Sequence, residues 1–429
     1  MFRAMVRVLS HKGNLAGLVA CAGWLLWGIC PAASAQELRL KPLLEEALQR
    51  SPEILAAKAR AQAAHHKVPQ ARSLPDPMFM TGYQNEGWKR YTYGEMPDAQ
   101  WMFSASQMIP FPGKLGLKGE MAEQEARGLD SSAEYAALQV LARVKELFHD
   151  LFLAYKTLDI LAQTRALFSR LEEAALARYS SGTGPQQEVL MAQTERYMLL
   201  EREEMQRQRI RSLEAMLSSA LGRSAHVPLG RPEEPSITPL HKSPEQLLQL
   251  ANERSPQLKA RARMVEAAEA KVSMARKEYF PDLTLTGNYF SRGAGQFEDM
   301  WSLTATVNVP IFFRTKQEEG VKEARSSLLE ARHELEATRL MIESSIRDNY
   351  AMVKSGENLL SLYREAIIPK QYQDFELALS GYTTGKIEAL TVISRLKAFL
   401  DTELLYWSQL AQREKALARI EALVGGGWE

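Results

Sequence analysis

Polar and apolar residues alternate along two short stretches in the second half of the chain. From 301 to 309 the odd positions are apolar and the even ones carry Ser, Thr or Asn, and 283–289 alternates in a similar way. A period of two predicts β-strands with one apolar face. The runs approach the roughly nine to eleven residues of a tilted membrane strand whose other face lines a watery lumen. A soluble sheet with one buried face fits the strands equally well.

Longer stretches have the periodicity of helices. No proline interrupts residues 113–180 or 314–368. The first of these would span roughly 100 Å at a rise of about 1.5 Å per residue, far beyond a typical globular helix. Apolar residues recur every seven positions, which predicts coiled-coil packing. The first set is Ala137, Val144, Leu151 and Leu158 with Val140, Leu147, Ala154 and Leu161; the second is Leu328, Leu335 and Ile342 with Ala331, Thr338 and Ser345.

The chain repeats itself at a spacing near 200 residues. The segment LLEEALQRSP at 43–52 returns as LLQLANERSP at 247–256, and WMFSASQMIP at 101–110 returns as WSLTATVNVP at 301–310. Such a duplication predicts the same elements twice, in the order helix, two strands, long helix, tight turn, helix. We expect a first repeat over 36–227 with its hairpin at about 76–111, a proline-rich linker over 228–244, and a second repeat over 245–429 with its hairpin at about 281–312.

The number of strands needed to close a membrane barrel distinguishes a membrane barrel from a soluble sheet. Two hairpins supply four strands, whereas the smallest membrane barrels need about eight, so several chains must share one barrel. The expected fold is mainly α with transmembrane β-hairpins, continued by long periplasmic helices. Aromatic residues mark the expected rims of the barrel. Tyr83, Trp101, Tyr289 and Trp301 fall at one rim, and Phe111 and Phe312 at the other.

Composition and the N-terminus narrow the setting. Lys plus Arg total 53 against 52 Asp plus Glu, so no basic surplus points to nucleic acid. A basic start, an apolar run over 15–29 and Ala33-Ser34-Ala35 predict a signal peptide over 1–35. An alternative is a lipobox that ends at Cys21, which would be lipidated. After residue 35 no apolar run approaches the roughly 18 residues of a membrane helix.

The residues that carry catalytic or metal chemistry elsewhere are not arranged for it here. His333-Glu334 begins like a zinc-protease motif, but Ala337 stands where the second histidine belongs. We predict no catalytic residue, no cofactor and no metal site. Methionine thioethers would suit copper, yet packing is the favoured role for those around the first hairpin. They are Met78, Met80, Met96, Met102 and Met108.

Several motifs in this order resemble those of the TolC-like outer-membrane efflux proteins. They are LPDP at 74–77, IPFPGK at 109–114, VPIFFR at 309–314, and the turns RYSSGT at 178–183 and GYTTGK at 381–386. The resemblance covers essentially the whole mature chain. It implies a homotrimer with a twelve-stranded β-barrel continued by a periplasmic α-helical barrel, located in the outer membrane and in contact with its lipid.

The resemblance also implies a function. Such a trimer is a passive exit duct for drugs or toxic metal ions, and it works with a periplasmic adaptor (membrane fusion) protein and an inner-membrane pump of RND or ABC type. The LPDP and FPGK segments are more similar to those of metal-efflux relatives. The alternative is that the chain is itself a periplasmic adaptor or a coiled-coil binding module, although an adaptor usually has one helical hairpin between β domains.

In proteins of this family the two turns lie at the periplasmic tip, where adaptors dock and an iris opens. Gly182 and Gly385 suit a tight helix-to-helix turn because glycine accepts positive φ. Acidic residues often follow the turns, and Glu188 and Glu388 are the candidates for the iris; Thr391 and Ser394 stand where aspartates are common. The expected docking residues are Tyr179, Ser181, Gly182, Thr183, Tyr382, Thr384, Gly385 and Lys386.

Overall fold

A computed structural model describes residues 37–224, 229–293 and 295–427. The predicted signal peptide, its cleavage site and Cys21 lie outside these residues. Within them, no helix combines the length and the apolar character that crossing a membrane demands.

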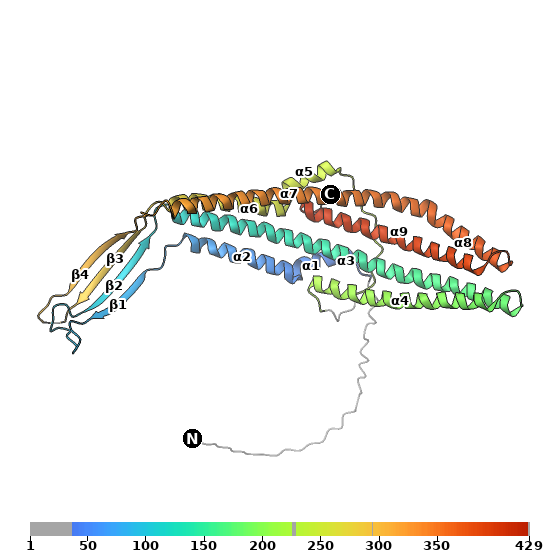
Figure 1. Cartoon of the computed structure of the whole chain (residues 1–429), viewed down its shortest axis with the longest axis horizontal. Coiled ribbons are helices and arrows are strands. Elements are labelled where there is room, and N and C mark those ends of the chain that lie inside the picture. Colours follow the sequence, from blue (N-terminus) through green and yellow to red (C-terminus); the bar gives the residue numbers. More distant parts are fainter. Residues whose placement is uncertain (1–36, 225–228, 294, 428–429) are drawn as a thin grey trace, which may run out of the picture. The chain divides into compact units, whose positions relative to one another are not determined.

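The same order of elements occurs twice along the chain (Figure 1). Each copy begins with two short helices that meet at a Ser-Pro step, Ser51-Pro52 or Ser255-Pro256, where proline occupies the first helical turn. The first copy contains α1 Leu40–Arg50, α2 Pro52–Arg72, β1 Met78–Gln84, β2 Gln100–Ile109, α3 Lys114–Ser180 and α4 Gln186–Leu221. The second contains α5 Pro244–Arg254, α6 Pro256–Lys277, β3 Leu283–Ser291, β4 Met300–Val307, α7 Gln317–Leu362, the π-helix η1 Tyr363–Ile367, α8 Ile368–Thr383 and α9 Ala389–Val424.

The four strands form one antiparallel sheet in the order β1-β2-β3-β4. The central pairing of β2 with β3 joins the two copies, with Phe103 opposite Tyr289. Because side chains alternate across a strand, this register gathers Phe79, Phe103 and Leu303 on one face and leaves Ser, Thr, Asn and Met on the other. Among the described residues, no strand pairs with the outer edge of β1 or of β4.

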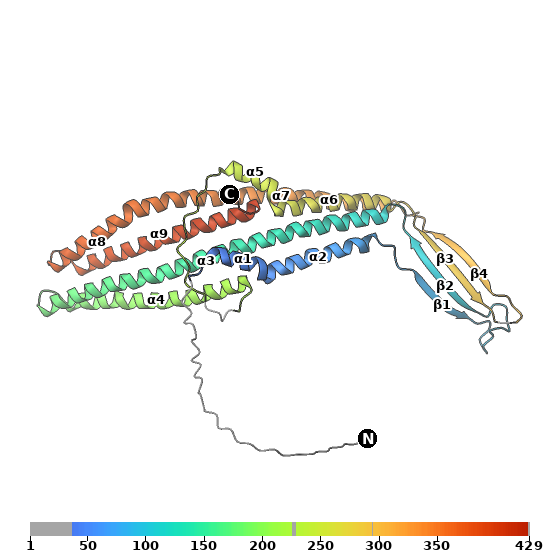
Figure 2. The same ribbon diagram turned by 180° about the vertical axis from the view of Figure 1, so that it is seen from behind.

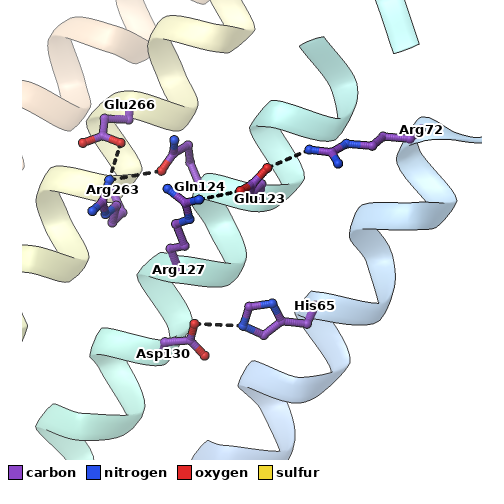
Figure 3. Close-up of polar contacts among 8 residues, drawn as sticks. All are labelled: His65, Arg72, Glu123, Gln124, Arg127, Asp130, Arg263 and Glu266. Atoms are coloured by element: carbon purple, nitrogen blue, oxygen red, sulfur yellow. Dashed lines mark hydrogen bonds and ion pairs between the residues drawn. The ribbon is translucent and has the colours of Figure 1, made fainter. Parts of the chain in front are cut away.

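The long helices pack around α3. It contacts α2, α4, α6 and α9, while α7 packs against α6 and α9. Figures 1 and 2 show α6 between α3 and α7, and α2 on the other side of α3. Figure 3 shows polar contacts from both neighbours: His65 and Arg72 of α2 reach Asp130 and Glu123 at 2.8 and 2.7 Å. Arg263 of α6 lies 3.5 Å from Gln124 of α3.

Each copy has its own apolar core, built from matching positions. The first core includes Leu43 and Ala47 of α1, and the second includes Leu247 and Ala251 of α5. In the first heptad set Val140, Val144, Leu151, Ala154 and Leu161 are buried, and Ala137, Leu147 and Leu158 pack partly buried against the core. In the second set Thr338 and Ile342 are buried, whereas Leu328, Ala331, Leu335 and Ser345 are half-buried. A third core joins the helices of both copies near the tip turns.

The two long helices differ in one respect. The first, α3, is continuous over 67 residues, whereas its counterpart is divided into α7, η1 and α8. Before η1, matching buried positions of the two long helices, such as Val140 and Ile342, are 202 residues apart. After η1, matching positions such as the tip glycines Gly182 and Gly385 are 203 residues apart, so the second helix contains one additional residue. A π-helix accommodates one inserted residue. It also precedes Pro369, whose missing N–H and bulky ring are poorly tolerated within a regular helix.

Candidate functional site

The two tip turns share one backbone geometry. Gly182 and Gly385 have φ of 74° and 76°. In the first turn the N–H of Thr183 donates to the carbonyl of Arg178 at 2.9 Å, and in the second the N–H of Lys386 donates to that of Gly381 at 2.9 Å. A left-handed glycine that closes a helix in this way satisfies carbonyls that would otherwise lack partners. The glycines chosen from the sequence therefore occupy positions that need them.

One arginine connects the two turns. Nη1 of Arg178 donates a hydrogen bond of 2.7 Å to the carbonyl of Tyr382, and its guanidinium lies 4.6 Å from the centre of the Tyr382 ring. The Tyr382 hydroxyl in turn donates to Oε2 of Glu188 at 2.8 Å. Burial, together with the bond to Glu188, raises the pKa of Tyr382 above its ordinary value. We call Arg178, Glu188 and Tyr382 the tip link.

Most of the expected docking residues are accessible. Tyr179 is 46% exposed, whereas Tyr382 is fully buried. The matching sequences RYSSGT and GYTTGK do not distinguish these two tyrosines, because the difference arises from the neighbouring helices that cover Tyr382. The Tyr382 ring is thus unavailable to a docking protein in this conformation, which differs from our expectation for it. The exposed turn residues are Tyr179, Ser181, Gly182, Thr183, Thr384, Gly385 and Lys386.

Two positions exchange large and small side chains between the turns. Where the first turn has Arg178 and Gly184, the second has Gly381 and Ile387. A Cβ on Gly381 would lie 2.6 Å from Cδ1 of Ile387, and one on Gly184 would lie 3.1 Å from Cβ of Arg178. Each turn therefore has space for one large side chain. The first uses it for a cation that reaches the other turn, and the second for an apolar contact.

The two candidate iris carboxylates have different surroundings. Glu188 belongs to the tip link, whereas Glu388 is exposed at the start of α9 and its side chain has no partner among the described residues. A further ion pair joins the hairpins below the turns, from Lys397 of α9 to Glu195 of α4 at 3.0 Å. Sequence reasoning missed Arg178 and Lys397. The sequence did indicate that Arg178 is unusual, because the matching position of the second turn is a glycine.

Aromatic residues gather at both ends of the sheet. Tyr83 lies opposite Trp101 and Tyr289 opposite Trp301 in the strand register, and the Tyr83 and Trp101 rings are 5.2 Å apart. At the other end Phe111 stacks on Phe280 at 4.5 Å, and Phe312 is 70% exposed. The rim residues proposed from the sequence thus occur in two groups separated by the length of the strands.

The methionines of the strands lie on the polar face. Met78 and Met80 are opposite Ser106 and Ser104, and Met108 is opposite Thr284. They are more exposed in the single chain than packing positions would be, with Met78 at 65%. In the part of the chain that the structure describes, no group of three His, Cys, Asp or Glu side chains is arranged to hold a metal ion.

Comparison with known proteins agrees with this architecture. The family model described as outer membrane efflux protein matches residues 43–223 and 247–426, one match in each copy. The structure of the outer membrane protein VceC from Vibrio cholerae superposes with a TM-score of 0.77 at 19% identity, covering 91% of this chain and 97% of that one. The expected fold class is confirmed: this is the two-repeat, mainly helical fold of the efflux channels.

Curated relatives include proteins named for different cargoes. The cobalt-zinc-cadmium resistance protein CzcC of Cupriavidus metallidurans is 21% identical over 96% of both chains. The outer membrane protein OprJ of Pseudomonas aeruginosa is 26% identical, and that match covers 41% of this chain and only 38% of OprJ. The family match decides against the adaptor alternative, since it includes both copies with their strands. This chain belongs to the outer membrane efflux protein family.

Proposed function

We propose that the chain is the outer-membrane exit duct of a tripartite efflux system. The observation that carries this proposal is the shared sheet, whose strands all join helices at one end and lead from there into two long helical hairpins. The hairpins contact each other through the core near the tip turns, through the tip link and through ion pairs such as Lys397–Glu195. Such a molecule joins a membrane element to a distant periplasmic end. Three such molecules around one axis would enclose a path for solutes.

Three copies would complete the membrane element. In the part of the chain that the structure describes, no strand pairs with the outer edges of β1 and β4, and lipid cannot hydrogen-bond their backbone groups. Twelve strands from three chains would close a barrel whose apolar face meets outer-membrane lipid and whose polar face lines the duct. Tyr83, Trp101, Tyr289 and Trp301 would form one aromatic rim, and Phe111 and Phe312 the other.

The tip link would hold the duct closed at its periplasmic end. A charge-assisted hydrogen bond of the Arg178 kind contributes about 1.5–3 kcal/mol. Opening requires the α3–α4 hairpin to separate from α8 and α9, which breaks the bonds of Arg178 and Tyr382. A periplasmic adaptor that binds the exposed turn residues would supply that energy. An inner-membrane pump of RND or ABC type would drive transport, and the duct itself would be passive.

The cargo would be toxic metal ions or drugs. A metal-ion cargo is supported by the match to CzcC along nearly the whole chain, since that relative is named for resistance to cobalt, zinc and cadmium. A drug cargo is supported by the match to ArpC of Pseudomonas putida, a relative named as an antibiotic efflux pump outer membrane protein.

The test compares sensitivity in four strains: the parent, a strain without this chain, a strain without the neighbouring pump, and a strain without both. We expect loss of the chain to raise sensitivity to one cargo class among cobalt, zinc, cadmium and antibiotics. Loss of both proteins should add nothing to the loss of the pump, because a duct without its pump exports nothing. Additive effects, or recovery of the chain outside the outer-membrane fraction, would contradict the proposal.

A further inference from the structure

A buried ion pair connects the two copies where the strands meet the helices. Lys114, the first residue of α3, is only 2% exposed. Its Nζ lies 2.9 Å from Oδ1 of Asp282 and donates to the carbonyl of Phe280 at 3.0 Å. The same Oδ1 accepts the N–H of Phe111 at 2.7 Å, and Phe111 stacks on Phe280. We call these four residues the inner junction.

The inner junction is built from two motifs that each occur twice. Phe111 and Lys114 follow β2, and Phe280 and Asp282 precede β3. Burial alone would raise the pKa of Asp282, but the bonds from Phe111 and Lys114 outweigh it and lower that pKa, so the pair is ionised. The junction thus joins the end of one hairpin to the start of the next.

The repeat places the same kinds of residue at the two outer edges of the sheet. Aligned with IPFPGK, the motif VPIFFR puts Ile311 at the position of Phe111 and Arg314 at that of Lys114, both after β4. Aligned with FPD, the motif LPD puts Leu74 at the position of Phe280 and Asp76 at that of Asp282, both before β1. The chain therefore contains the residues for a second junction of the same kind. Two of them, Leu74 and Asp76, lie beside the β1 edge of the sheet, and the other two, Ile311 and Arg314, lie beside the β4 edge.

These four residues are exposed and unpaired in the single chain. Leu74 is 51% and Ile311 69% exposed. Across 37–224, 229–293 and 295–427, neither Asp76 nor Arg314 forms an ion pair or a side-chain hydrogen bond. They cannot meet within one chain, because two intervening strands separate their edges by about 14 Å at roughly 4.8 Å per strand.

We propose that Asp76 of one copy pairs with Arg314 of the neighbouring copy, with Leu74 against Ile311, so that an outer junction between subunits reproduces the inner junction within each chain. The proposal rests on the shared barrel proposed above, in which β4 of one copy adjoins β1 of the next. Lys316, two residues beyond Arg314 and also exposed, adds a second cation beside the same carboxylate.

Cross-linking tests the contact directly. Detergent-extracted outer membranes carrying Asp76→Cys together with Arg314→Cys are treated with a short bis-maleimide, and covalent size is read after denaturation. The natural cysteines are Cys21 and Cys30, so the unsubstituted chain is treated in parallel. We expect covalent dimers and trimers from the double variant alone. Each single variant, and the mismatched pair Asp76→Cys with Glu298→Cys at opposite ends of the strands, should remain monomeric.

Charge exchange tests the chemistry of the pair. Asp76→Arg should reduce the trimer that survives mild detergent by about tenfold. Arg314→Asp with Lys316→Asp should do the same. Combining Asp76→Arg with Arg314→Asp and Lys316→Asp should restore much of the trimer, because the charges on the two sides are then exchanged. Glu298→Arg, an exposed acidic site in the β3–β4 loop, is the matched control and should leave the trimer unchanged.

The possible results separate the pair from the duct. Covalent trimers together with rescue by exchange support the outer junction. A native trimer that gives no cross-link, or charge variants without effect, would overturn the outer junction and leave the proposed duct intact. A monomeric unsubstituted chain would overturn the shared barrel and the outer junction with it.

Discussion

The interiors of the two repeats differ where α4 and α9 pack against the long helices. The first repeat buries Ile210, and the second buries Arg413 at the matching position, 203 residues further on. Arg413 is 1% exposed and bonds Glu357 at 2.8 Å, the carbonyl of Thr238 at 2.6 Å, and Glu414. The backbone frame has thus been kept after duplication, while this buried position is apolar in the first repeat and charged in the second.

Space for the arginine comes from a neighbouring substitution. Gly356 lies beside Arg413, and a Cβ there would be 3.2 Å from the Arg413 Cβ. The matching residue of the first repeat is Ala154, which is buried with Ile210 in the first core. The carbonyl of Thr238 belongs to the linker between the repeats, so the arginine also fixes the path of that linker. At this position of the duplicated core, the buried charge is accompanied by changed partners and by added space.

Removing the arginine should have the largest effect on this comparison. Arg413→Ala leaves Glu357 and Glu414 without their main partner, and breaking a buried pair in this way costs about 3–5 kcal/mol. The free energy of unfolding of the detergent-solubilised protein, followed by helical circular dichroism in urea, measures the loss. Lys354→Ala is the control, since Lys354 pairs with the same Glu357 at the surface and should cost under about 1 kcal/mol. Equal losses from both variants would contradict a special role for the buried charge.

Among the described residues, the first repeat buries His149 and the second buries no histidine, so acid should weaken the protein at this position of the first repeat. Burial lowers the pKa of His149 from 6.5 to about 4, and Ala351 stands at the matching position. The unfolded chain takes up the proton first as pH falls. The stability contributed by neutral His149 is therefore complete above pH 6.5, declines below it, and is lost by about pH 4.

This titration should remove about 3 kcal/mol between pH 7 and pH 4, at about 1.4 kcal/mol per pKa unit. Unfolding free energies of the parent and of His149→Gln, measured across that range, give the difference. The variant should show a shallower decline, because glutamine does not titrate. If the two unfolding free energies fell in parallel with pH, His149 would not be the cause of the pH dependence of stability.

Breaking the tip link should have a smaller effect on stability and a visible one on conductance. Arg178→Met keeps the stem of the side chain and removes its bonds to Tyr382, which should cost about 1.5–3 kcal/mol. In planar bilayers we expect more frequent opening than in the parent protein. Lys386→Met, an exposed change in the other turn, is the matched control. Unchanged opening in Arg178→Met would argue against the link as a closure device.

The smallest effect is expected from removing the inserted residue of the second long helix. Deleting Glu365 together with Pro369→Ala should convert η1 to regular helix and preserve the register on both sides, at a cost below about 1 kcal/mol. The matching deletion of Gln163 from α3 should be far more damaging, because it rotates every later contact by about 100°. Circular dichroism melting curves compare the two. Equal damage would show that η1 is not an insertion.

The periodic features of this protein could be read from the sequence. Strand alternation at 301–309, the glycines of the tip turns and the internal repeat all depend on local pattern, and all correspond to observed elements. The tip link could not be read in this way. It depends on which helices cover Tyr382, and its partners are 194 and 204 positions apart. Arg413 sits in the charged run Arg413-Glu414-Lys415, so its burial had no signal in composition.

The pairing of β2 with β3 also constrains the order in which the molecule assembles. Its partners, such as Ile109 and Leu283, are distant along the chain, whereas the β1–β2 and β3–β4 hairpins are local. Hairpins form in microseconds, but contacts of long sequence separation form slowly because a large loop must close first. More than 170 residues must therefore follow the first hairpin before β3 can pair with the free edge of β2. The complete four-stranded sheet can therefore form only after the second hairpin has been synthesised.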